Sequence, residues 1–163
     1  MLSLINKTTK VIITTCTLLL LSSIAFKEDA ARAENLSEQA KNPHQQIFLS
    51  ANSTVSKHLL TRREIRAIFT MRLTHWPDGQ PITVFVVNDD NAIHIQFCKN
   101  ILNIFPHQLR AAWNKLEFSG TGQGPIELST LQEMHQALTL TPGSIGYLNE
   151  NANDASLQNL QFR

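Results

Sequence analysis

The pattern that most constrains the fold is an alternation of short apolar runs with amphipathic helical segments, from Gln45 onward. The clearest apolar run, Ile82–Val87, is rich in β-branched residues, which favours a strand buried on both faces. Helical spacing precedes and follows this run, so strands and helices are expected to share one core. We therefore predict an α/β fold in which layered helices surround a mixed sheet.

Capping residues and apolar spacing locate the other elements. Thr61 and Glu64 form a capping box, in which each side chain satisfies a free amide at a helix start. Further helices are expected from Ile93 to Ile104 and from Pro106 to about Lys115. Ser129 and Gln132 form a second capping box, which predicts a helix that continues to Leu138. Strands at Gln46–Ser50 and Ile145–Leu148 complete the order β-α-β-α-α-loop-α-β. The aromatic residues assigned to the core are Phe69, Phe85, Phe97, Trp113 and Phe118.

Residues 1–33 have the features of a secretion signal and its flank. Lys7 and Lys10 precede the apolar run Val11–Leu21, which is shorter than the ~20 residues of a membrane-spanning helix. Small-x-small cleavage sites end at Ala25 and at Ala33, and the sequence does not choose between them; a retained membrane anchor is the alternative. We expect a polar leader over residues 34–45, the domain over 46–150, and a fraying polar tail over 151–163.

The charge of the mature chain excludes a broad basic field. Cleavage after Ala33 removes four of 14 Lys and Arg and two of 13 Asp and Glu, which leaves ten against eleven. Nucleic acid is therefore not an expected partner, and any preference for anions must come from a local site. Cys98 is then the single cysteine, so no internal disulfide is expected, and the histidines lack the spacing of a metal site.

Catalytic motifs are missing from the sequence. No nucleophile elbow, Walker loop or dinucleotide fingerprint occurs, so we expect neither an enzyme nor a cofactor. Cys98 would lie within a helix among apolar neighbours, which raises the pKa of a thiol and favours a structural role.

Three segments resemble the phosphate-binding periplasmic proteins of ABC transporters, which belong to the type II periplasmic binding proteins. These segments are Leu60–Phe69, the turn Trp76–Gly79, and Thr141–Leu148, in the order and spacing that this family shows. The resemblance implies a periplasmic binding protein fold and a phosphate or other small-anion ligand. Full members of the family have two lobes that close on the ligand, whereas the mature chain has the length of about one.

The phosphate loop of the family would fall at Asn88–His94. The resemblance implies an arginine and a Ser-Gly-Thr sequence there, but this chain has Asn88, Asp89, Asp90 and Asn91 instead. The carboxylates would repel a dianion and could accept a hydrogen bond from a protonated ligand. We select Asn88, Asp89 and Asn91 as candidate ligand contacts; the alternative is that these residues only cap the following helix.

The glycine-rich stretch Ser119–Gly124 is the second candidate. Ser119, Gly120, Thr121 and Gly122 could direct backbone amides and hydroxyls toward an anion. The alternative is an ordinary connector.

Together these features predict a periplasmic solute-binding module for an ABC transporter or a sensor. Because one lobe cannot enclose a ligand, a second subunit, as in a homodimer, or another partner would supply the opposite wall. The alternative function is a lobe without ligand that acts as a protein-interaction module in the envelope.

Overall fold

The computed structural model describes residues 46–151 and 154–163. The expected secretion signal and polar leader, residues 1–33 and 34–45, lie outside the described residues. No helix in the described part of the chain has the length and apolarity required to cross a bilayer.

A mixed sheet forms the centre of the domain, which confirms the predicted fold class. Its strand order is β4-β3-β5-β1-β6, and a second sheet pairs β2 with β7. Strand β3 runs parallel to β4 and to β5, whereas β1 runs antiparallel to β5 and to β6. The strands are β1 (Phe48–Asn52), β2 (Leu59–Leu60), β3 (Thr83–Val87), β4 (Ile126–Leu128), β5 (Ser144–Leu148), β6 (Leu157–Asn159) and β7 (Gln161–Phe162).

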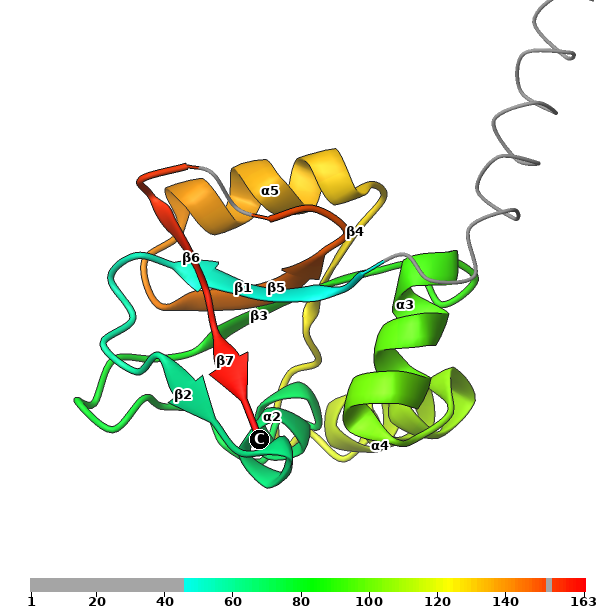
Figure 1. Cartoon of the computed structure of the whole chain (residues 1–163). Helices are drawn as coiled ribbons and strands as arrows, with labels where there is room; N and C mark the ends of the chain where they lie inside the picture. Colours follow the sequence, from blue (N-terminus) through cyan, green and yellow to red (C-terminus); the bar gives the residue numbers. More distant parts are fainter. Residues whose placement is uncertain (1–45, 152–153) are drawn as a thin grey trace, which may run out of the picture. The chain divides into compact units, whose positions relative to one another are not determined.

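Helices cover both faces of the sheet (Figure 1). Helix α5 (Leu131–Leu140) packs on one face, where it contacts β1, β3 and β5. On the other side lie α2 (Arg62–Phe69), α3 (Ala92–Phe97), the π-helical turn η1 (Cys98–Leu102) and α4 (Pro106–Phe118). These layers bury the apolar residues of β3 and β5, because a central strand has helices above and below it.

Local sequence signals account for the helix starts. The Thr61 hydroxyl accepts from the Glu64 amide and the Glu64 carboxylate accepts from the Thr61 amide, which is the predicted capping box. At α5 the cap lies one residue later than predicted: Thr130 accepts from the Glu133 amide, so the pair Ser129 and Gln132 was wrong.

Two expectations about the edges of the domain differ from the structure. The C-terminal residues, expected to fray, form β6 on β1 and β7 on β2, and Leu157 and Leu160 are buried. Phe118, assigned to the core, is 89% exposed, because α4 extends past Lys115 and its last residues, Glu117 and Phe118, face solvent. The remaining four aromatic residues assigned to the core are buried.

Candidate functional site

The carboxyl end of β3 carries a cluster of paired charges. Arg110, on α4, donates from Nε and Nη2 to the two carboxylate oxygens of Asp89 at 2.8 and 2.9 Å. Its Nη2 also donates to Glu127 of β4 at 2.7 Å, and the guanidinium lies over the Trp113 ring at 4.9 Å. The hydrogen bonds from Arg110 lower the pKa of Asp89, and the same bonds raise the pKa of Arg110. Asp89 and Arg110 are therefore both ionised at neutral pH.

The two candidate asparagines at this edge also make internal contacts. Asn91 caps α3, because its side-chain oxygen accepts from the Ile93 amide at 2.9 Å. With its side-chain amide oriented so that the nitrogen faces β4, Asn88 donates to Leu128 O at 3.2 Å and to Glu127 Oε1 at 3.1 Å. The alternative that Asn91 caps the following helix is therefore confirmed, and the role of these residues as ligand contacts stays a prediction.

Beneath the charged cluster lies a buried polar chain that the sequence did not reveal. Tyr147 Oη accepts from the Val87 amide at 3.0 Å, so the hydroxyl proton is free to be donated to His94 Nδ1. The histidine proton is then on Nε2, which faces Cys98 Sγ at 3.3 Å and Asp89 Oδ1 at 3.6 Å. Burial raises the pKa of Cys98 to about 12, so its thiol stays protonated and unreactive.

The burial of His94 predicts a loss of stability in mild acid. Burial lowers the pKa of His94 below 6.5, although the Asp89 carboxylate opposes this shift. When the pH drops below the pKa of this histidine in the unfolded chain, the unfolded chain binds more protons than the folded chain. The free energy of unfolding must therefore decrease as the pH decreases. We expect the urea midpoint to decrease between about pH 7 and about pH 5. The measurement is urea unfolding by circular dichroism across this range.

Replacing His94 by glutamine is the matched control, because it removes the group that titrates in this window. The pKa of Asp89 is lowered by its hydrogen bonds from Arg110, and the pKa of Glu64 is lowered to about 2, so both carboxylates lose their contribution to stability only in stronger acid. A midpoint that stays constant or rises from pH 7 to 5 in the unmodified chain would show that His94 is not held neutral.

The loop after α4 directs most of its amides back to the helix. The amides of Ser119, Gly120 and Thr121 donate to the carbonyls of Lys115, Glu117 and Leu116. The hydroxyls of Ser119 and Thr121 bond each other at 2.7 Å. This loop is also the C-terminal end of a helix, where carbonyl dipoles disfavour an anion. Gly122 is exposed and has no side chain that could donate a hydrogen bond, so the loop offers few donors.

The structure does not bring the two predicted segments together. Strand β4 runs parallel to β3 with Leu128 opposite Val87, so Asn88 lies at the carboxyl end of both strands. Residues 119–122 precede β4 and lie toward its other end. Ser119 also follows Arg110 by more than two helical turns, about 13 Å along the axis. One small anion can therefore contact one segment or the other, but not both.

Arg110 is the residue that sequence reasoning missed at this edge. The expected loop lacks the arginine that the family resemblance implies, and α4 supplies a guanidinium to the same place from a different element. Among residues 46–151 and 154–163, no group of three or more His, Cys, Asp or Glu side chains is placed to hold a metal ion.

Comparison with solved structures gives matches to phosphate-transport proteins. An ABC-type phosphate transport receptor from Vibrio cholerae matches with a TM-score of 0.53 and 13% identity, over 71% of this chain and 45% of the receptor. The second match is a putative phosphate ABC transporter substrate-binding protein from Clostridium perfringens with bound phosphate. Its TM-score is 0.56 and its identity 17%, over 71% of this chain and 44% of that protein. PstS from Borrelia burgdorferi matches with a TM-score of 0.56 and 17% identity, over 72% of this chain and 47% of PstS. No family model and no curated protein matches the sequence.

These matches establish the fold. The chain has the fold of part of a phosphate-transport substrate-binding protein, and it spans less than half the length of each of the three. The resemblance predicted from the sequence, with the length of a single lobe, is confirmed at this level.

Proposed function

We propose that this chain is a periplasmic solute-binding module that holds a small oxyanion of the phosphate class at the carboxyl edge of β3. The observation that carries the proposal is the fold shared with phosphate-transport proteins, one of which contains bound phosphate. Ligands in open α/β sheets bind beyond the carboxyl ends of the strands. In this chain, that edge presents Asn88, Asp89, Asn91 and Arg110.

The charges at this edge favour a protonated oxyanion over a fully ionised one. Arg110 is the single cation in a cluster with Asp89 and Glu127, so a dianion would meet a net negative charge. A ligand hydroxyl can instead donate to one of the carboxylates while the ligand's charged oxygens approach Arg110. Phosphate near neutral pH carries such a hydroxyl, whereas sulfate does not.

A single lobe leaves one side of the ligand exposed to solvent. Binding pockets usually bury most of the surface of a ligand, so the affinity of the chain alone should be modest. The second wall would come from a membrane transporter, a sensor protein or a second copy of the chain. In this proposal the module presents its anion to that partner in the periplasm.

Inorganic phosphate is expected to raise the melting temperature, and more at about pH 6 than at about pH 8. A ligand at about ten times its Kd stabilises a folded protein by about 1.4 kcal/mol, or about 3–6 °C for a domain of this size. Sulfate should produce no comparable rise at either pH, because it has no proton to donate to Asp89 or Glu127. The measurement is a thermal-shift titration with both anions.

Two variants locate the effect. Arg110→Gln should abolish the response to phosphate, whereas Lys115→Gln, which removes an exposed charge from the same helix, should preserve it. Loss of the response in the double variant Ser119→Ala/Thr121→Ala, with Arg110→Gln retaining it, would move the site to the loop after α4. A flat response of the unmodified chain to every anion would contradict the proposal.

The second candidate function is a protein-interaction module without a free ligand. It is favoured by the ion pairs of Arg110, which satisfy its guanidinium internally and leave no unpaired charge at the β3 edge among the residues of this cluster. This function predicts the flat response, together with binding to an envelope protein.

A further inference from the structure

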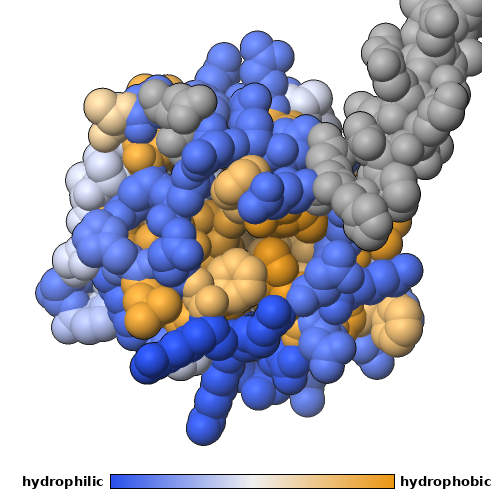
Figure 2. All heavy atoms as spheres, in the orientation of Figure 1, coloured by the Kyte–Doolittle hydropathy of each residue, from blue (hydrophilic) through white to orange (hydrophobic). Residues whose placement is uncertain are grey.

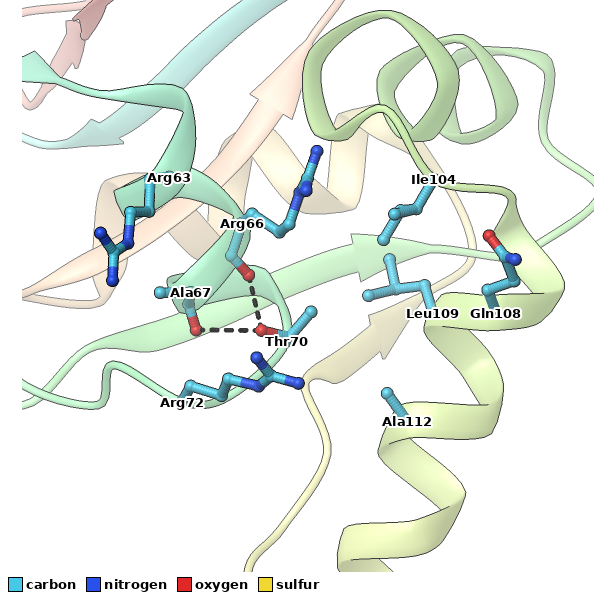
Figure 3. A pocket seen from close by; sticks show the side chains of 9 residues that line it. All are labelled: Arg63, Arg66, Ala67, Thr70, Arg72, Ile104, Gln108, Leu109 and Ala112. Carbon is cyan, nitrogen blue, oxygen red and sulfur yellow. Dashed lines mark hydrogen bonds between the residues drawn. The ribbon is translucent and has the colours of Figure 1, made fainter.

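A hollow of about 520 Å³ lies between α2 and α4 (Figure 3). Three arginines, Arg63, Arg66 and Arg72, line it from the side of α2. Ile104 and Leu109 contribute apolar surface from the opposite side. The hollow thus combines concentrated positive charge with an apolar wall.

The end of α2 positions the arginines. Met71 has φ 59°, and the Arg72 amide donates back to Ala67 O, so the chain folds over the last turn of the helix. In Figure 3 the guanidinium of Arg72 points toward the space between the helices, whereas the side chain of Arg63 points away from α4, on the far side of α2. Arg66 donates from Nε to Leu102 O at 2.9 Å, which fixes its side chain beside η1.

No carboxylate lines this hollow to balance the arginines. Within the described residues, Arg63 and Arg72 form no ion pair, in contrast to Arg110, which has two carboxylate partners. Figure 2 shows very hydrophilic side chains gathered along the edge of the molecule where α2 lies in Figure 1. This positive charge is therefore available to a partner.

A second hollow of about 340 Å³ adjoins the first, since both are lined by Ile104 and Gln108. It adds the cation of Lys99 and the ring of Phe105, which is 54% exposed. We call the two hollows together the α2–α4 groove. Each of the two volumes exceeds what a single small anion would fill.

We propose that the α2–α4 groove binds an acidic peptide segment of another protein, with apolar side chains between its carboxylates. The arginine forks match carboxylates in a bidentate manner, and the apolar wall and Phe105 match the aliphatic side chains. Concavity favours a peptide over a flat lipid surface. The proposal goes beyond oxyanion binding at the β3 edge and does not depend on it.

Fluorescence anisotropy tests the proposal on the purified chain, with a labelled peptide of alternating glutamate and leucine as the probe. The double variant Arg63→Gln/Arg72→Gln should weaken binding about tenfold, since each lost charge-assisted contact at an exposed site costs roughly a factor of three. The matched double variant Lys115→Gln/Arg163→Gln removes the same charge outside the groove and should change the affinity less than about twofold.

A second probe with glutamine in place of glutamate should bind at least about tenfold more weakly to the unmodified chain. If both double variants lost the same affinity for the peptide, the binding would depend only on the total charge of the chain, and the proposal would be overturned. Unchanged affinity in Arg63→Gln/Arg72→Gln would overturn it as well. The same variant should keep its thermal response to phosphate, so failure here and failure of oxyanion binding are separate results.

Discussion

Replacing Trp113 by alanine should lower the free energy of unfolding by about 3–5 kcal/mol, the usual cost of removing a buried aromatic side chain. Trp113 is 1% exposed on α4, and its indole nitrogen donates to Phe69 O at the end of α2, at 2.8 Å. Its ring also supports the Arg110 guanidinium. The change would leave a cavity, an unsatisfied buried carbonyl and a less restrained arginine.

Urea unfolding followed by circular dichroism measures this loss. Trp113→Phe is the matched control, because it keeps most of the apolar volume and removes the hydrogen bond, at a cost of about 1–2 kcal/mol. If Trp113→Ala cost no more than Trp113→Phe, the indole would not be filling the interior between α2 and α4.

Gly143→Ala should also be strongly destabilising, by about 3 kcal/mol or more. Gly143 has φ 74°, which costs other residues about 1–2 kcal/mol. A Cβ there would lie 2.5 Å from Pro81 O, so the backbone would have to move. That movement would disturb the bond from the Trp76 indole to Gly143 O, at 2.9 Å.

Gly120→Ala separates the two causes of this loss. Gly120 has φ 66°, but a Cβ there would meet no atom within 4 Å. It should therefore cost only about 1 kcal/mol, the price of the backbone conformation. If Gly143→Ala and Gly120→Ala were equally destabilised in thermal unfolding, the turn at Gly143 would accommodate a side chain without a clash.

Elements set by neighbouring residues could be predicted, whereas those set by distant pairing could not. The Thr61–Glu64 box and the buried run of β3 are local signals, and both are present. The sequence predicts a fraying tail where β6 and β7 form, because strands of three and two residues carry little pattern of their own. Their pairing with β1 and β2 joins segments about a hundred residues apart, which propensity does not register.

The same limit applies to the candidate site. Asn91 could be recognised as a cap, since its contact lies two residues away. Arg110 reaches Asp89 across 21 residues, and only the packing of α4 beside β3 brings them together. The separation of Ser119–Gly122 from Asn88 depends on β4, a three-residue strand that the sequence did not reveal. One signal was available: Arg110 lies three residues before Trp113, so a helix places both on the same face. Since Trp113 is assigned to the core, this spacing indicates that α4 directs the cation of Arg110 toward the sheet.

The most direct test of the central claim is a titration of the isotope-labelled chain with inorganic phosphate, followed by backbone amide chemical shifts. We predict saturable shifts for Asn88–His94 and for Arg110, with little change at Gly120 and at Arg72. This result would place the oxyanion at the carboxyl edge of β3. No saturable shift at millimolar phosphate, or shifts confined to residues 119–122 or to the α2–α4 groove, would contradict the account.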